Sequence, residues 1–172
     1  MKAPLPLLFA CVTLLALPNF SLRAQIIPDG ATNVLAEVTN AITGSVTVGT
    51  NGSFTLLVLS NNALLTNSGN GIIGRNATAR SNEVQLLSAT ARWLAGGDLS
   101  VGSNGAMSRL VVSNGARMEN FIGSLATGVQ SSNNFALVTG GGSLWSNRAN
   151  VIVGWFGRDN QLLVGNGGRP EL

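Results

Sequence analysis

The sequence of 172 residues lacks histidine and tyrosine altogether, and it contains a single cysteine, Cys11, and a single lysine, Lys2. Zinc sites built from cysteine and histidine are therefore excluded. A serine nucleophile would have no histidine base, and beyond residue 2 no lysine to replace it. We accordingly expect no catalytic residues, no metal and no cofactor. Because one cysteine cannot form an intramolecular disulfide, backbone hydrogen bonds and apolar burial must hold the chain together.

Charge is also scarce, since Asp, Glu, Lys and Arg make up only 10% of the chain, against about 25% in ordinary globular proteins. The 19 asparagines and 16 serines supply most of the polar surface instead. Beyond residue 24 the arginines are scattered singly along the sequence. Phosphate binding requires clustered basic residues, so nucleic acid is not an expected partner. These arginines are Arg75, Arg80, Arg92, Arg109, Arg117, Arg148, Arg158 and Arg169.

The N-terminal segment has the features of a signal peptide. After Lys2, an apolar run extends from Leu5 to Leu17, and Leu22-Arg23-Ala24 ends in the small residue that signal peptidases prefer. The run is shorter than the roughly 20 residues that a membrane-spanning helix needs. We expect residues 1–24 to be removed on export, leaving a secreted or cell-surface protein with no membrane span. A retained membrane anchor and lipidation of Cys11 are the alternatives.

Removal of that segment would change the electrostatics. Lys2 and Arg23 leave with it and no acid does, so eight basic and seven acidic residues remain, and the net charge falls from +3 to 8 − 7 = +1. We therefore do not expect a strongly basic mature protein.

An internal repeat organises the rest of the chain. Sliding residues 93–117 by 52 positions onto residues 145–169 matches 9 of 25 residues without a gap. An earlier copy lies 53 residues upstream, where Val48-Gly49 and Asn61 correspond to Val101-Gly102 and Asn114. The matched pairs are Trp93/Trp145, Val101/Val153, Gly102/Gly154, Gly105/Gly157, Leu110/Leu162, Val112/Val164, Asn114/Asn166, Gly115/Gly167 and Arg117/Arg169.

Each 52-residue unit divides into two related units of about 26 residues. The ends of successive apolar runs, Ser88, Ser113, Thr139 and Gly165, are 25, 26 and 26 residues apart. Each small unit reads as a short β-prone run, a turn, and a second run that ends in a turn, often with an Asn-Gly pair. Helical periodicity is weak, and its one candidate, residues 31–42, is equally compatible with a capping strand or turn.

A short period with several strands per unit predicts a parallel β-solenoid. Coils stacked about 4.8 Å apart would pair every strand with the coil above and below and bury the inward Val, Leu and Ile. Asn61, Asn114 and Asn166 would then lie at one corner in alternate coils, where amide ladders stabilise the stack. A β-sandwich or a propeller blade is the alternative. We divide the chain into the leader, an N-terminal cap or lead-in (residues 25–45) and the solenoid repeats (residues 46–172).

Two phrases carry a resemblance to a bacterial repeat. The segments are 132–147, SNNFALVTGGGSLWSN, and 151–168, which begins VIVGW and ends LLVGNGG. They resemble the repeat shared by type V secretion (autotransporter) passenger domains and PEP-CTERM-sorted surface proteins. The resemblance implies a right-handed parallel β-helix of exported, adhesin-like proteins, with no catalytic motif in the repeat. The sequence ends within a repeat at residues 169–172, without a translocator barrel or sorting tail, so we expect an incomplete array.

The acidic residues do not form a recognisable catalytic group. Glycoside hydrolysis needs two carboxyl groups at a defined separation. The seven acids are not adjacent in the sequence, and we interpret them as solvated turn residues. The leading hypothesis is an exported structural or adhesin-like segment that displays a polar face to glycans or other cell-surface components. The alternative is a fragment of a polysaccharide-active β-helix enzyme, a lyase or glycosidase, whose active site lies outside this chain.

The tryptophans are the remaining candidates for contact. Trp93 and Trp145 occupy one repeat position, as core or corner fillers or as a surface platform for glycan rings. Trp155 and Phe156 replace the polar turn residues of the other copies and indicate contact with a neighbouring coil or a partner. Unpaired strand edges of the last coil would favour self-association.

Overall fold

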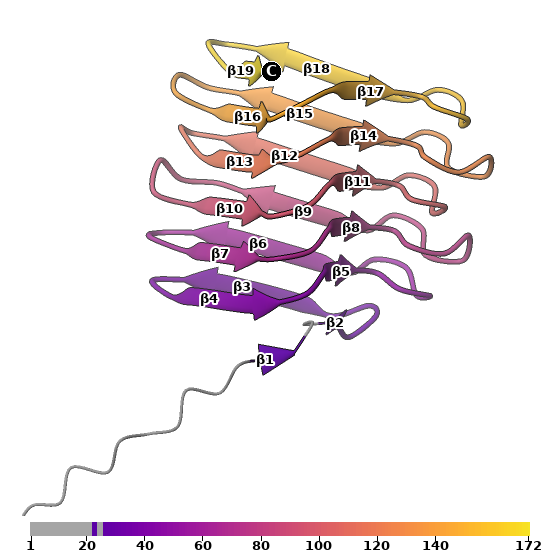
Figure 1. Cartoon of the computed structure of the whole chain (residues 1–172), viewed down its shortest axis with the longest axis horizontal. Helices are drawn as coiled ribbons and strands as arrows, with labels where there is room; N and C mark the ends of the chain where they lie inside the picture. The colour runs from indigo at the N-terminus through magenta and orange to yellow at the C-terminus, as the bar shows by residue number, and fades with distance from the viewer. Residues whose placement is uncertain (1–21, 24–25) are drawn as a thin grey trace, which may run out of the picture.

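The computed structural model describes residues 22–23 and 26–172, and in this part of the chain every regular element is a β-strand. The strands form a right-handed parallel β-solenoid in which one turn takes about 26 residues (Figure 1). The predicted all-β solenoid fold is therefore confirmed. Each coil contributes one strand to each of three sheets, which we call sheets A, B and C, and the chain visits them in the order B, C, A.

All three sheets are parallel and run along the solenoid axis. Sheet A contains β1 (Leu22–Arg23), β4 (Thr39–Thr43), β7 (Leu64–Asn67), β10 (Arg92–Ala95), β13 (Arg117–Asn120), β16 (Leu144–Asn147) and β19 (Arg169–Glu171). Sheet B contains β2 (Ile26–Ile27), β5 (Val46–Val48), β8 (Gly71–Ile73), β11 (Leu99–Val101), β14 (Gly123–Leu125) and β17 (Val151–Val153). Sheet C contains β3 (Thr32–Ala36), β6 (Leu56–Ser60), β9 (Glu83–Leu86), β12 (Arg109–Ser113), β15 (Phe135–Thr139) and β18 (Gln161–Gly165).

The N-terminal part of the described chain already follows the coil pattern. Strands β2, β3 and β4 pair in register with the next coil, so the segment predicted as a lead-in, residues 25–45, has the three-strand order of the repeats. The weak helical candidate at residues 31–42 forms strands β3 and β4 with a short turn between them. The predicted signal peptide, residues 1–24, lies outside the described residues except for β1, which pairs with β4.

The register places the repeat valines on one sheet. Val101 pairs with Leu125, which pairs with Val153, so the two valines lie two coils apart in sheet B. Val48 lies on the same sheet in β5. The glycine that follows each of these valines has a positive φ of 74–78°, which is a backbone region that favours glycine where the chain turns from sheet B.

The last of these Val-Gly pairs, Val153 and Gly154, differs from its equivalents in burial. Val153 is 44% exposed and Gly154 is also exposed, whereas the earlier valines and glycines are buried. A Cβ added to Gly102 would lie 2.4 Å from the side-chain amide of Asn134 in the next coil. One added to Gly154 would meet nothing closer than the carbonyl oxygen of Gly157, at 3.5 Å. Gly154 is therefore less crowded than Gly102, because no further coil of the described residues packs over it.

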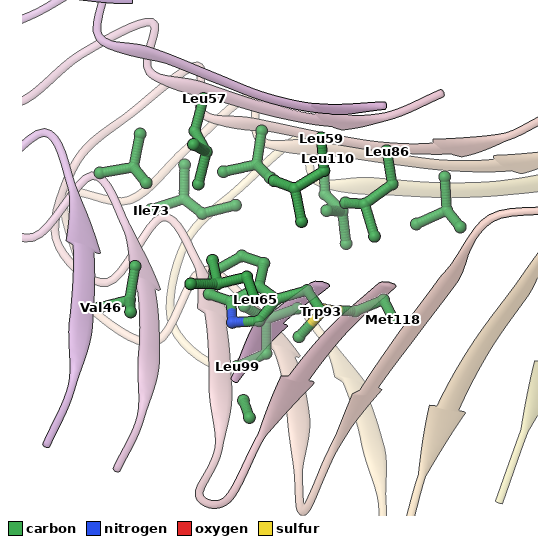
Figure 2. Close-up of a cluster of buried hydrophobic side chains, with 14 of the residues drawn as sticks. Val46, Leu57, Leu59, Leu65, Ile73, Leu86, Trp93, Leu99, Leu110 and Met118 are labelled. Carbon is green, nitrogen blue, oxygen red and sulfur yellow. The ribbon is translucent and has the colours of Figure 1, made fainter. Parts of the chain in front are cut away.

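The core lies between the three sheets and is a set of columns of equivalent residues. Alternate residues of each strand point inward, and those of the central coils are fully buried (Figure 2). One column of sheet C reads Leu57, Val84, Leu110 and Ala136 along the axis. Because each coil covers the apolar side chains of its neighbours, the hydrophobic core is continuous from coil to coil.

Alternation between large and small residues explains why the sequence repeats over two coils. Trp93 and Trp145 are fully buried in sheet A, and each fills space that a glycine of its own coil leaves in sheet B. A Cβ added to Gly71 would lie 2.8 Å from the Trp93 ring, and one added to Gly123 would lie 2.7 Å from the Trp145 ring. The register alternates these glycines with larger residues along sheet B, in the order Val46, Gly71, Leu99, Gly123 and Val151.

The buried tryptophans also need hydrogen-bond acceptors, which buried asparagines of the preceding coil supply. The indole N–H of Trp93 donates to Oδ1 of Asn67 at 2.8 Å, and that of Trp145 donates to Oδ1 of Asn120 at 2.7 Å. Nδ2 of Asn120 in turn donates to Oδ1 of Asn147 at 2.9 Å. Polar atoms inside sheet A are thus paired between coils.

A second set of asparagines, of which Asn82 and Asn134 are buried and Asn160 is partly exposed, lies at the corner between sheets B and C. Oδ1 of Asn82 accepts from the backbone N–H of Thr55 at 2.9 Å, and Oδ1 of Asn134 accepts from Ser108 at 2.8 Å. Oδ1 of Asn160 accepts from the backbone N–H of Asn134 at 2.9 Å. Each amide therefore caps the backbone of the preceding coil where the strand ladder is interrupted.

The predicted position of Asn61, Asn114 and Asn166 at one corner in alternate coils is confirmed, but these residues form no ladder of direct amide contacts. All three are exposed turn residues with positive φ at the corner between sheets C and A. Asn114 Nδ2 donates to the carbonyl of Leu87, and Asn166 Nδ2 donates to Oγ1 of Thr139. Two coils separate these asparagines by about 9.6 Å, which is too far for direct amide contact.

The large–small alternation predicts energetic coupling between Gly71 and Trp93. Gly71→Ala should destabilise the fold by about 1–3 kcal/mol through overpacking. Trp93→Leu should destabilise it by about 2–4 kcal/mol through a cavity. The double variant should be more stable than the sum of these effects by at least about 1 kcal/mol, because the smaller side chain makes room for the added methyl group. Denaturant unfolding of the four proteins measures this coupling.

Gly141→Ala is the matched control for this cycle. A Cβ at Gly141 would meet no atom within 4 Å, and its φ is not positive, so the same substitution should be nearly neutral there. Strict additivity of the Gly71 and Trp93 variants would show that these residues do not share the same space.

Asp29 links the turn of one coil to the turn of the next. Its carboxylate oxygens accept from the backbone N–H groups of Thr50 at 2.7 Å and Asn51 at 3.0 Å. Slight burial raises the pKa of Asp29, but the hydrogen bonds from the backbone of residues 50–52 outweigh this effect and leave the pKa below its ordinary value.

The lowered pKa of Asp29 predicts a pH-dependent contribution to stability. A carboxyl with a pKa lower in the folded than in the unfolded state stabilises fully above the unfolded value of about 3.9, and this contribution is lost as the pH falls through the folded value. Asp29→Asn should therefore lower the free energy of unfolding at about pH 6 and much less at about pH 2. The exposed Asp159→Asn serves as the control in the same denaturant titrations. An equal effect of Asp29→Asn at both pH values would contradict this role.

Candidate functional site

The outward faces of the three sheets differ in chemistry. Sheet A carries charged side chains, and sheet B carries hydroxyl groups, so sheet B corresponds best to the polar face expected from the sequence. Sheet C carries an outward column of apolar residues, which Gln85 interrupts. The apolar members of this column are Val34, Val58, Val111, Leu137 and Leu163.

A groove with a volume of about 300 Å³ runs over the outward face of sheet B, and we call it the sheet B groove. Its floor comes from the middle residues of β8, β11 and β14, and its sides come from the turns on either side of the sheet (Figure 1). The lining residues are Asn70, Gly71, Ile72, Asp98, Ser100, Ser103, Ile122, Ser124, Thr127 and Trp155.

The floor of the groove consists of one isoleucine and two serines in a single column. Ile72, Ser100 and Ser124 are register partners in successive coils, so their side chains are spaced by about 4.8 Å along the axis. The Ser100 hydroxyl lies 3.3 Å from the hydroxyl of Thr127, and the Ser124 hydroxyl donates to the carbonyl of Leu99 at 3.2 Å. Ser124 is buried, so the partly exposed hydroxyl groups of Ser100 and Thr127, which can both donate and accept, are the ones that a polar ligand can reach.

One side of the groove holds Asp98, in the turn that joins β10 to β11. Its carboxylate Oδ1 accepts from the backbone N–H of Ile122 at 3.1 Å, and its own backbone N–H donates to Oδ1 of Asn70 at 3.0 Å. Asp98 thereby links three successive coils and is the one carboxylate in the lining of the groove. The groove therefore offers a single carboxylate, whereas glycoside hydrolases generally use a pair.

The opposite side of the groove holds Trp155, in the turn after β17. Trp155 and Phe156 are 55% and 61% exposed, and their rings stack at a centroid distance of 6.2 Å with an interplanar angle of 17°. In the coil two turns earlier the equivalent turn has Ser103 and Asn104. The two aromatic residues singled out from the sequence therefore lie together on the surface, with Trp155 against the groove.

Trp93 and Trp145 are in register with Leu65 and Met118 in one inward column of sheet A. Both are fully buried, so the alternative of a surface platform for glycan rings is wrong for this pair. Trp155, which has no tryptophan counterpart in the other copies, is the exposed one. The two tryptophans that share a repeat position are therefore the buried ones, and the tryptophan without a counterpart in the other copies is exposed.

The interpretation of all acids as turn residues is wrong for three of them. Glu83, Glu119 and Glu171 lie in strands β9, β13 and β19. Glu119 and Glu171 are 52 residues apart, and both pair with Ser146, so they point outward from one column of sheet A. The repeat period was the signal that links them. In the described residues, no three acidic, histidine or cysteine side chains come together as a metal site.

The chain matches no protein-family model, no curated protein and no solved structure. Among residues 22–23 and 26–172, no helix is long and apolar enough to cross a membrane.

Proposed function

We propose that the protein is an exported, non-enzymatic solenoid segment with an adhesin-like role, and that it binds glycan chains in the sheet B groove. The observation that carries this proposal is the exposed ring of Trp155 in a groove that also presents the hydroxyl groups of Ser100 and Thr127. Ligand sites typically combine apolar or aromatic surface with a few well-placed polar groups. A pyranose ring presents C–H groups on one face and hydroxyl groups around its edge, which suits this combination.

The repeated geometry of the coils supports a linear ligand. Floor residues recur at about 4.8 Å along the axis, so a polymer lying along the groove would meet similar groups at each coil. Strands on a continuous core give a rigid floor, and less conformational entropy is lost when a ligand binds to it. The extracellular setting rests on the predicted leader, residues 1–24, and on the resemblance to autotransporter and PEP-CTERM repeats.

The second candidate is a polysaccharide-active enzyme. Glu119 and Glu171 favour it, because their two-coil separation of about 9.6 Å is close to the upper limit for the carboxyl pair of an inverting glycosidase. The two glutamates, however, line two different hollows, Glu171 beside Arg117 and Arg169 and Glu119 beside Arg148, and they do not share one cleft. Binding without turnover is therefore the better-supported function.

Replacing Trp155 tests the proposed glycan site. Trp155→Ala should weaken binding to a preferred neutral glycan at least fivefold, which corresponds to about 1 kcal/mol of lost ring contact. Phe54→Ala is the matched control, because Phe54 is a 74% exposed aromatic residue that does not line the groove. Screening the chain and both variants against immobilised cell-wall and extracellular glycans gives the affinities. Equal loss of affinity in both variants would reject the groove as the site.

The same glycans, after incubation with the chain, distinguish binding from catalysis. We expect no new reducing ends and no unsaturated products. Turnover that disappears in Glu119→Gln, with the fold retained, would establish the enzymatic alternative.

A further inference from the structure

Three arginines that are far apart in the sequence share one outward column of sheet A. Arg92 and Arg117 are direct register partners, and Arg117 is followed along the axis by Leu144 and then by Arg169. All three arginines are exposed. The interpretation of these arginines as scattered singly is therefore wrong, because intervals of 25 and 52 residues return the chain to the same place.

The arginine column is not neutralised by the protein. Within the described part of the chain, the one ion pair joins Arg109 to Glu83 on sheet C. Arg92 and Arg117 are about 4.8 Å apart along the axis, and like charges in directly paired positions destabilise a sheet. An anion bound between them would relieve this repulsion.

Arg148 adds a fourth positive charge at the edge of the same face. Its Nη2 donates to the carbonyls of Ala95 and Gly96 at 3.2 Å each, which holds the guanidinium across two coils. The neighbouring outward column holds Glu119 and Glu171. Four arginines and two glutamates give this face a net charge of 4 − 2 = +2, whereas the chain beyond residue 24 has +1 in total.

A hollow with a volume of about 480 Å³ lies beside the column, and it is lined by Arg117, Arg169, the carboxylate of Glu171 and residues of the turns between sheets C and A, mostly glycines. These turns carry few side chains, and a Cβ at Gly141 would meet no atom within 4 Å. A bulky polymer can therefore approach the arginines closely.

We infer that the outward face of sheet A binds an acidic polysaccharide through its carboxylate or sulfate groups. Guanidinium groups bind both anions through paired, charge-assisted hydrogen bonds. Arg117 and Arg169, separated by about 9.6 Å, would contact anionic groups of non-adjacent sugar units.

A nucleic acid fits this face less well. Its outward columns contain no aromatic side chain on which bases could stack. The inference does not depend on the sheet B groove.

The test compares the full chain with the double variant Arg92→Gln/Arg117→Gln. Binding to polygalacturonate, as the carboxylate probe, and to dextran sulfate should weaken at least tenfold and should fall with added salt. Neutral dextran should not compete. The control Arg75→Gln/Arg80→Gln removes the same charge from exposed positions in the segment between β8 and β9 and should bind like the parent. Leu144→Arg, which fills the gap in the column, should strengthen binding.

The outcomes separate this inference from the proposed groove. Arginine-dependent binding of either polyanion supports the sheet A site, and the stronger of the two identifies the anionic group. Equal losses in both double variants, or no binding to either polyanion, would overturn it. Stronger arginine-dependent binding of a single-stranded oligonucleotide would replace it with a nucleic-acid site. Trp155→Ala should leave polyanion binding unchanged.

Discussion

Parallel hydrogen bonding between successive coils is the constraint from which the other features of this molecule follow. Each strand pairs with the equivalent strand of the coils above and below, so equivalent residues are fixed about 4.8 Å apart. A side chain is therefore accommodated only if it packs against, or hydrogen-bonds to, the residues directly above and below it. Val and Leu satisfy this requirement by stacking in the core, and asparagine satisfies it by hydrogen bonding to the preceding coil.

The same constraint explains how so few charges and no disulfide in the described chain are sufficient. Buried amides link one coil to the backbone or indole group of another, at Asn82 and Asn134 on one corner and at Asn67 and Asn120 inside sheet A. Such hydrogen bonds are worth little each, but an unpaired buried group is costly, and the Oδ1 atoms of these four asparagines are all paired, whereas Nδ2 of Asn82 is not. The tryptophans add a second condition, since each requires a glycine opposite it in the same coil.

Stacking of the coils also determines which side chains lie next to one another on the surface. Side chains that point outward form columns along the axis, so one residue type repeated at the coil spacing becomes a stripe. This gives sheet B a hydroxyl floor, sheet C an apolar stripe and sheet A a basic column. Departures from the repeat matter as much as the repeat itself. Trp155 replaces a polar turn residue of the other copies. It thereby places an aromatic ring, stacked on Phe156, in the sheet B groove.

The sequence by itself determined the solenoid, its period and the common position of Trp93 and Trp145, because a repeat without gaps requires equivalent residues to be equivalent in space. It did not determine which asparagines are buried, since Asn61 and Asn134 look alike until the strand ends are known. The 52-residue interval between Glu119 and Glu171 is visible in the sequence, but the shared column of Arg92 and Arg117 is not. Coil lengths vary by a few residues, so only the register of the folded strands decides which distant side chains become neighbours and which face of the sheet they share.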